Sequence, residues 1–156
     1  MIPFDAPAFT ISGVNRGRVV SIHDGDTLTC VMYYCEGYFK FSVRMDGIDT
    51  PEMTSKDPEL KNRALAARDR LFHLVCNGFE HINTTNWKKK DFDEFFRNTF
   101  VAVNLDCKGL DKYGRLLATI GNPSFSSILV QEGLAYPYSG KTKLTEQEQL
   151  DLKLPQ

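Results

Sequence analysis

Three strand-like segments separated by tight turns fill residues 16–45, and no other feature constrains the fold as strongly. The first two segments, in RGRVVSIHDGDTLTCVMYY, are rich in β-branched and aromatic residues and flank an Asp-Gly-Asp turn. A second turn, CEGY, precedes a third segment, FKFSVRM, in which apolar and polar residues alternate. The apolar residues expected to share its buried face are Phe39, Phe41, Val43 and Met45. Residues 16–45 are therefore predicted to form a curled antiparallel meander.

Helical and strand-like patterns follow one another along the rest of the chain. Residues 57–75 begin with Asp-Pro and repeat apolar residues at helical spacing, which predicts a helix. Residues 78–98 are polar with scattered aromatics, and we predict a surface insertion that contains one short helical turn. Two strands are predicted in residues 99–120, and a short helix in residues 124–133. A loop, AYPYSGKTK, then leads to a final helix with a TEQE capping box.

This order of elements predicts an α+β fold, namely a five-stranded Greek-key β-barrel of the OB type with about three packed helices. Barrels of this type commonly bind oligonucleotides or oligosaccharides. The length of 156 residues suits one domain with a single core, so residues 1–156 are assigned to one domain. Residues 1–13, with apolar side chains among prolines and small residues, are expected to form an extended arm packed on it.

The composition argues against several classes of protein. The apolar runs are too short to span a bilayer, so no membrane partner is expected. The four cysteines form no CxxC pair and have no histidine at zinc spacing, which favours reduced, mostly buried thiols over disulfides or zinc. The net charge of −1 is not typical of a strong nucleic-acid binder, so any polyanion must be handled by a few placed cations.

The N-terminal sequence, MIPFDAPAFTISGV, lacks the charged start and the continuous apolar core of a signal peptide. We therefore expect an intracellular protein, or a secreted one whose leader has been removed. No feature of the sequence defines an oligomeric state, although an extended N-terminal arm could reach a neighbouring molecule.

Nine residues, RMDGIDTPE at 44–52, combine one arginine with three carboxylates. A proline follows Thr50, so the backbone there is held extended and stiff. This frame around Asp49, the Thr50 carbonyl and Glu52 suits a hard cation, which prefers carboxylate and carbonyl oxygens. Asp26, from the turn before the second strand, could add a second carboxylate. Taken alone, however, the stretch is more typical of an acidic turn with solvated charges.

Two arginines favour a catalytic site over an acidic turn with solvated charges. Arg44 could form a structural ion pair, but its guanidinium also matches two phosphate oxygens, and Arg115 in the turn DKYGR offers a second such group. Two arginines, two metal-ligating aspartates and a spare glutamate together suit phosphodiester hydrolysis. The metal would polarise a phosphoryl oxygen, the arginines would stabilise growing charge, and the glutamate would position or deprotonate water.

Four segments in this order, SIHDGDTLTC, FSVRMDGIDTPE, DKYGRLLATI and LVQEGLAYPY, resemble the signature segments of the thermonuclease (staphylococcal nuclease-like) family. The resemblance runs from about Gly17 to Tyr138 and is interrupted by the insertion. It implies an OB barrel with packed helices and a nuclease that cleaves single-stranded DNA and RNA with little sequence preference, leaving 3′-phosphate ends. The implied cofactor is Ca²⁺, with Mg²⁺ or another hard divalent ion as an alternative.

The resemblance also implies a role for individual residues. The implied metal ligands are Asp26, Asp49 and, through its carbonyl, Thr50. The implied catalytic residues are the phosphate-binding Arg44 and Arg115 and the general base or water-orienting Glu52. The implied substrate-binding residues are Lys112 and Tyr113, which would contact a terminal phosphate, and Tyr136 or Tyr138, which would stack on the base. The sequence leaves open which of the two tyrosines stacks.

Some features depart from the family pattern or have plainer interpretations. The chain is slightly acidic, whereas the best-known family member is basic. The insertion contains WKKK, which could steer phosphate while Trp87 stacks on a base, but a solvated loop with Trp87 and Phe92 against the core is slightly favoured. Asp46 is expected to be a turn carboxylate, Asp24 a partner behind the metal site, and the three histidines structural.

The alternative function is a non-catalytic module that binds nucleic acid or protein on the same barrel. Such modules typically lose the acids and arginines of the site, all of which are present here. A plain oligosaccharide- or peptide-binding OB module would leave this set of acids and arginines unexplained. We therefore expect a calcium-dependent phosphodiesterase whose partner is a single-stranded nucleic acid.

Overall fold

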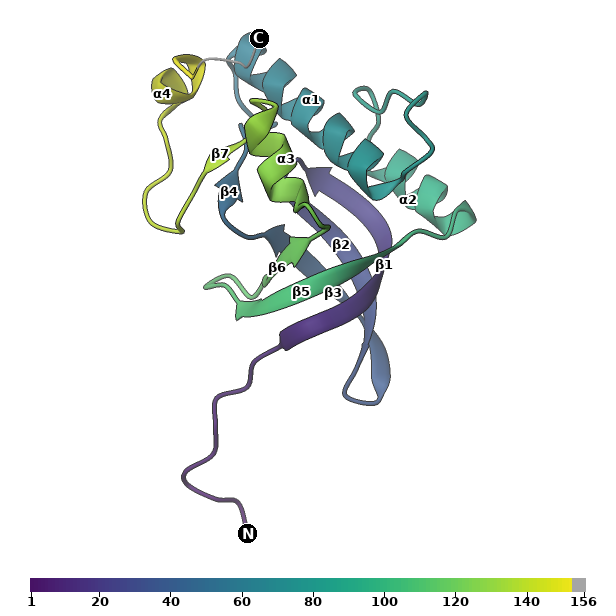
Figure 1. Cartoon of the computed structure of the whole chain (residues 1–156), viewed down its shortest axis with the longest axis vertical. Coiled ribbons are helices and arrows are strands. Elements are labelled where there is room, and N and C mark those ends of the chain that lie inside the picture. The colour runs from purple at the N-terminus through teal and green to yellow at the C-terminus, as the bar shows by residue number, and fades with distance from the viewer. Residues whose placement is uncertain (153–156) are drawn as a thin grey trace.

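The computed structural model describes residues 1–152 and is built around a closed barrel of five strands (Figure 1). The barrel strands are β1 (Ser12–Asp24), β2 (Thr27–Tyr34), β3 (Gly37–Met45), β5 (Ala102–Leu110) and β6 (Leu116–Ile120). Their order around the barrel is β1-β2-β3-β6-β5, and β5 pairs with β1 to close it. The β3–β6 pair is parallel and the other pairs are antiparallel. This is the OB barrel that the order of elements predicts.

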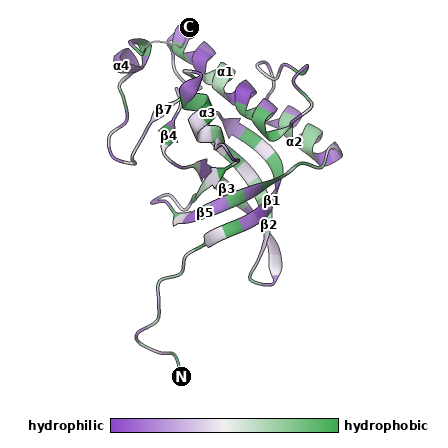
Figure 2. Cartoon of the chain, viewed as in Figure 1, coloured by the Kyte–Doolittle hydropathy of each residue, from purple (hydrophilic) through white to green (hydrophobic). Residues whose placement is uncertain are grey.

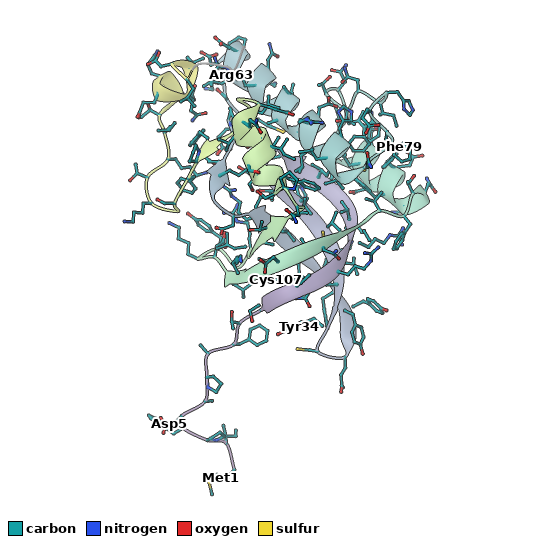
Figure 3. The ribbon with its side chains drawn as sticks, viewed as in Figure 1. Met1, Asp5, Tyr34, Arg63, Phe79 and Cys107 are labelled. Atoms are coloured by element: carbon teal, nitrogen blue, oxygen red, sulfur yellow. The ribbon has the colours of Figure 1, made fainter. Side chains whose placement is uncertain are left out.

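Four helices, rather than about three, are found in the described residues. They are α1 (Pro58–Val75), α2 (Lys89–Asn98), α3 (Phe125–Gln131) and α4 (Glu146–Leu150). The α1 helix begins as predicted, because the Asp57 side chain accepts hydrogen bonds from the backbone of Glu59 and Leu60. The predicted capping box of α4 is also present, and Arg63 of α1 donates to the Gln149 carbonyl 2.7 Å away (Figure 3). None of these helices is long and apolar enough to cross a membrane.

One hydrophobic core joins the barrel interior to the inner faces of α1, α2 and α3. Hydrophobic and hydrophilic residues mix along the barrel strands, as Figure 2 shows, because successive side chains point inward and outward. The core extends to the turn between β1 and β2, where Gly25 lies against α1. A Cβ atom at Gly25 would come within 2.6 Å of the Ala67 Cβ atom. This close contact requires glycine and fixes the turn that carries Asp24 and Asp26.

The predicted buried face of β3 is buried only in the second half of the strand. Val43 and Met45 are in the core, but Phe41 is half-buried and Phe39 is 52% exposed. The first half of β3 pairs with the end of β2 as a hairpin that projects beyond the barrel (Figure 1). Apolar and polar residues alternate along this hairpin, but its apolar side chains are not fully buried, because no other element of the described residues covers this part of β3.

Residues 78–98 differ from the predicted surface insertion with one short helical turn. Their second half forms the ten-residue helix α2, which packs on β1 and places Phe92 and Phe96 in the core at 0% and 1% exposure. Trp87 is half-buried, with its ring 5.4 Å from that of Phe72 and 5.1 Å from that of Phe92. Trp87 is thus used for packing, as the plainer interpretation expected, and its ring is not free to stack on a base.

Two neighbouring residues of α1 anchor the segment that precedes α2. Arg68 is 5% exposed, donates to the Trp87 carbonyl at 2.8 Å, and lies 4.9 Å from the centre of the Phe92 ring. Asp69 accepts hydrogen bonds from the backbone and hydroxyl of the fully buried Thr84 at 2.7 and 2.8 Å. These contacts explain why a polar segment is held against the core.

Residues 1–10 do not form the packed arm that was expected. Figure 1 shows them running away from the barrel, and the side chains of Ile2 and Phe4 are 94% and 100% exposed. Contact with the domain begins only near the end of the arm, where the Tyr34 hydroxyl donates to the Thr10 carbonyl at 3.2 Å. The end of the predicted arm does pack on the domain, because Ile11 is 2% exposed in the core and the Phe9 ring lies 6.0 Å from that of Tyr34. The expected packing is therefore found only from about Phe9 onward.

Candidate active site

A cleft of about 110 Å³ opens at the end of the barrel where five segments meet. They are the β1–β2 turn, the end of β3, the short strand β4 (Ile48–Asp49) with the residues after it, the β5–β6 turn, and the loop after β7 (Tyr136–Pro137). The cleft is lined by Asp24, Asp26, Thr27, Arg44, Asp49, Thr50, Pro51, Glu52, Arg115 and Lys143. The structure thus brings together all the predicted metal ligands and catalytic residues.

The pair of two-residue strands β4 and β7 positions Asp49 (Figure 1). The segment AYPYSGKTK is predicted to be a loop, but its Tyr136 pairs with Asp49 and its Pro137 with Ile48. The Tyr136 hydroxyl also donates a hydrogen bond to Oδ2 of Asp49. Asp49 is therefore fixed from both its backbone and its side chain, and it is only 3% exposed.

Asp26 is oriented by hydrogen bonds from two threonines. The Thr27 hydroxyl donates to its Oδ1 at 2.8 Å, while the backbone N–H and the hydroxyl of Thr50 donate to its Oδ2 at 3.1 and 3.0 Å. Asp26 and Thr50 are 6% and 4% exposed. These bonds link the β1–β2 turn directly to the stretch RMDGIDTPE, which explains why the two motifs act as one site.

Arg44 joins the two aspartates. Its Nη2 lies 3.1 Å from Oδ1 of Asp49 and 3.5 Å from Oδ2 of Asp26, while its Nη1 donates to the Met45 carbonyl at 3.0 Å. The residue is 5% exposed, and a buried charge of this kind is tolerated only when it is paired and hydrogen-bonded. Of the two roles considered for Arg44, the structural ion pair is present. Arg44 also borders the cleft, where a phosphate-binding role would require it to lie.

Four carboxylates and three basic side chains line the cleft, and the pKa values of two of the carboxylates, Asp24 and Asp49, are raised. Burial, reinforced by the charges of Asp26 and Glu52, raises the pKa of Asp24 to about 6. Burial also raises the pKa of Asp49, although the hydrogen bond from Tyr136 opposes this shift. Burial is the largest cause of both shifts, and the neighbouring carboxylate charges add to it.

The donor set fits a hard divalent cation held partly by water. Two buried carboxylates, Asp26 and Asp49, lie within reach of one guanidinium nitrogen, and Thr50 lines the same cleft. Within residues 1–152 no group of three or more His, Cys, Asp and Glu side chains could hold a metal by itself. The protein would thus supply two carboxylates and one carbonyl, and water would complete the six to eight oxygen ligands of Ca²⁺.

Glu52 lies at the mouth of the cleft and is the most exposed of its acids, with a side chain that is 62% exposed. Its Oε1 lies 3.5 Å from the Nζ atom of Lys143, which is also 3.4 Å from Oδ1 of Asp49. Burial opposes the charge of Lys143, but Asp49 and Glu52 outweigh it and raise the pKa of this lysine. Lys143 thus stands between a predicted metal ligand and the predicted general base.

Arg115 reaches the cleft from a turn that Asp111 closes. Oδ1 of Asp111 accepts hydrogen bonds from the backbone of Tyr113 and Arg115 at 2.9 and 2.8 Å, and its Oδ2 is 2.8 Å from Nε of Arg115. Gly114 has a φ of 81°, a conformation that favours glycine. The Arg115 side chain lines the cleft and is 33% exposed.

A larger pocket of about 470 Å³ adjoins the cleft. Arg44 and Arg115 border both cavities. The predicted substrate-binding residues that line the pocket are Lys112, Tyr113 and Tyr138. The pocket therefore continues the cleft beyond Arg44 and Arg115.

The family described as "Staphylococcal nuclease homologue" matches the chain over residues 42–154, which is more than half of its length. The chain belongs to this family. Its members are generally nucleases that hydrolyse nucleic acids. No curated protein matches the chain. The matched range begins after Asp26, which the structure nevertheless places in the same cleft as Asp49, as the resemblance implies.

In this nuclease homologue the two candidate tyrosines have different environments. Tyr136 is 4% exposed and its hydroxyl donates to Asp49, so its ring is buried and it positions that carboxylate. Tyr138 lines the larger pocket, and its ring centre lies 6.0 Å from the guanidinium carbon of Arg44. The geometry therefore favours Tyr138 as the tyrosine that would contact substrate.

Sequence reasoning missed Lys143 and the role of Tyr136 in this nuclease homologue. Both come from the segment after α3, 87 and 94 residues beyond Asp49, and neither lies in the acid-and-arginine motifs of the site. A signal for Tyr136 did exist, because AYPY lies within one of the segments that resemble the family. No comparable signal marked Lys143, which is one of two lysines in KTK.

Proposed function

We propose that this protein is a divalent-metal-dependent, sequence-nonspecific endonuclease that hydrolyses phosphodiester bonds of DNA or RNA. Calcium is the proposed metal, and 3′-phosphates are the proposed products. The family supports a nuclease-like function in general, and the finer assignment rests on the cleft. The observation that carries it is the link from Asp26 through Arg44 to Asp49, with Glu52 and Arg115 in the same cleft.

Each residue of the cleft has a defined task in this proposal. A divalent cation, when bound, would polarise the phosphoryl oxygen and neutralise charge on the phosphate. Arg44 and Arg115 donate hydrogen bonds to phosphate oxygens, and their donation strengthens as charge grows in the transition state. Glu52, exposed at the mouth, orients the attacking water and accepts its proton.

The larger pocket supports a single strand as substrate. At about 470 Å³ it falls in the range of pockets that hold one small ligand, such as a nucleotide. Tyr113 is 72% exposed and can stack on a base, while Lys112 beside it can meet a phosphate. Bases that are already unpaired reach such a pocket at lower cost than bases in a duplex.

The experiment that tests the proposal is hydrolysis of single-stranded DNA, duplex DNA and RNA with Ca²⁺, with Mg²⁺ and with EDTA. Glu52→Gln is the matched variant, because it removes the carboxylate of an exposed side chain and keeps its volume. We expect metal-dependent cleavage that EDTA abolishes and that Glu52→Gln slows by about 10²–10⁴-fold. Single-stranded substrates should be cleaved faster than duplex DNA.

Two results would contradict the proposal. An unimpaired Glu52→Gln enzyme would remove the assigned role of that glutamate. Binding of nucleic acid without cleavage under any metal would show that the cleft is kept as a non-catalytic binding module.

A further inference from the structure

A second groove, of about 440 Å³, lies between α2 and the outer faces of β1, β2 and β3. Its basic side chains are Arg18, Lys40, Lys89 and Arg97, and Asp93 is its one carboxylate. Lys89 and Asp93 pair with each other at 2.5 Å. Within residues 1–152 the other three basic side chains form no ion pair, so the groove has a local excess of positive charge in a chain whose net charge is −1.

The floor of this groove is polar and incompletely bonded. The Ser21 side chain is 3% exposed, and its hydroxyl has no hydrogen-bond partner of normal geometry in the described residues. It lies close enough to Asp93 to help Lys89 lower the pKa of that carboxyl, but it does not reach hydrogen-bond geometry. Next to it, the His23 ring is 2.8 Å from the Thr29 hydroxyl. The Asp93 carboxylate is thus the nearest acceptor for the Ser21 hydroxyl, and the groove owes its positive character to the basic side chains around it.

The α2 helix forms one wall of the groove and also contributes two of its basic side chains, Lys89 and Arg97. Nη2 of Arg18 donates to the Phe96 carbonyl at 3.0 Å, and its guanidinium lies 5.3 Å from the centre of the Phe100 ring. Arg18 is thus held at the C-terminal end of α2, beside Arg97. Lys89 begins the helix at the other end of the groove.

Strand register connects this groove to the catalytic cleft. Arg44, Ser42 and Lys40 lie on one face of β3, opposite Thr27, Thr29 and Val31 of β2. Thr27 and Arg44 line the cleft, whereas Thr29 and Lys40 line the groove. Four residues of strand separate Arg44 from Lys40, which is about 13 Å. This is the β2–β3 face on which OB barrels commonly carry oligonucleotides.

We propose that the groove binds the sugar-phosphate backbone of the same nucleic-acid strand that enters the cleft, at phosphates beyond the one that is cleaved. This inference rests on the proposed function and extends its substrate to a strand several nucleotides long. The cations that meet phosphate are Lys40, Lys89 and Arg97. The binding is independent of sequence, because the groove presents charge and hydroxyl groups to the backbone rather than to bases.

The test compares a single-stranded 20-mer with a trinucleotide that fills only the cleft and the adjoining pocket. The groove variant is Lys40→Gln/Arg97→Gln, which removes two exposed cations. The matched control, Lys61→Gln/Lys108→Gln, removes the same charge from exposed side chains outside both cavities. Binding is measured by fluorescence anisotropy in EDTA over a range of salt concentrations, and hydrolysis is measured separately with Ca²⁺.

We expect the groove variant to bind the 20-mer at least about tenfold more weakly at 50 mM salt and the trinucleotide unchanged. The slope of log K against log salt for the 20-mer should fall by about 1.4, since each lost contact to a single strand contributes about 0.7. The KM for the 20-mer should rise while kcat is kept. The control variant should differ little from the wild type.

Equal weakening of the 20-mer by the control variant, or equal weakening of the trinucleotide by the groove variant, would overturn the inference. So would unchanged binding of the 20-mer. Because binding is measured without metal, the result stands apart from the proposed function: a wild type that binds through the groove and cleaves nothing would overturn only the hydrolytic assignment.

Discussion

Arg44 has two tasks that place opposite demands on a side chain. It holds Asp26 and Asp49 together from a buried position, and it borders the space where a phosphate would bind. The planar fork of a guanidinium can serve both tasks, because several N–H groups point in different directions at once. A lysine at this position would keep the charge and lose that geometry.

We therefore predict that Arg44→Lys lowers kcat/KM for nucleic-acid hydrolysis by about 10²–10³-fold, as when a single transition-state donor is removed. It should also lower the free energy of unfolding, because two buried carboxylates lose part of their pairing. Both effects can be measured, by steady-state hydrolysis and by urea denaturation. Arg115→Lys is the control: Arg115 is half-buried and, within residues 1–152, forms an ion pair with Asp111 alone, so activity should fall with little change in stability. Equal losses of stability in both variants would contradict this account of Arg44.

Under the proposed function, Lys143 would compete with a bound cation for Asp49. Its Nζ atom shares Oδ1 of Asp49 with Arg44 and also meets Glu52. Because its side chain is 51% exposed, solvent screens these contacts and each is weak. We predict that Lys143→Met tightens Ca²⁺ binding by up to about fivefold, measured by isothermal titration calorimetry. Lys141→Met, in the same loop but outside the cleft, should leave the affinity unchanged. Weaker binding by Lys143→Met would show that the lysine supports the site and does not compete with the ion.

At the residue scale the sequence revealed the parts of the site that form local motifs. Asp26, Arg44, Asp49, Glu52 and Arg115 each stand in a short stretch whose turns and charges suggest chemistry. Lys143 could not be found in this way, because its place in the cleft depends on how a distant loop folds back over β4. The same long-range pairing assigns Tyr136 to Asp49.

At the scale of elements, α2 shows how a polar segment can belong to the core. Seven of its ten residues, KKDFDEFFRN, are charged or polar, which suggested a surface insertion. The overlooked signal is the spacing of Phe92, Phe95 and Phe96, which puts three rings on one side of a helix. Lys88 at the N-cap makes no side-chain hydrogen bond, so the usual start signal of a helix was missing as well.

We predict that Phe92→Ala destabilises the protein by about 3–5 kcal/mol, because it removes a fully buried ring at the centre of the aromatic cluster. The free energy of unfolding from urea denaturation measures this effect. Phe4→Ala, in the exposed arm, is the matched control and should change stability by less than about 0.5 kcal/mol. Similar small effects of both substitutions would mean that α2 is not part of the cooperative core.

For the whole molecule, the order of strands was enough to predict the barrel. Three meander strands, a helix and two further strands leave few ways to close a sheet, and the observed order is one of them. The order of strands does not show which helix or loop, if any, covers the outer side of each barrel strand. Contacts between distant segments determine what covers the barrel. They therefore determine the projecting hairpin, the exposed arm and the groove under α2.

The site lies where segments from both halves of the chain meet, so a bound ion should stabilise the whole fold. Asp26 lies in the β1–β2 turn, Asp49 in β4, and Asp49 is tied through Tyr136 to β7. An ion that binds only the folded state adds about 2.7 kcal/mol at a concentration 100 times its Kd. For a domain of this size, we predict that saturating Ca²⁺ raises Tm by about 5–10 °C in a thermal unfolding experiment.

The control for this prediction is Asp49→Asn, which keeps the shape of a proposed ligand and removes its charge. Its Tm should respond little to Ca²⁺, whereas Asp46→Asn, a change to a carboxylate outside the cleft, should show the full wild-type shift. A wild-type Tm that does not respond to Ca²⁺ would mean that the two aspartates serve only to hold Arg44. An equal rise in Asp49→Asn would place the ion elsewhere on the molecule. The measurement thus separates an ion-binding cleft from a purely structural network without any assay of hydrolysis.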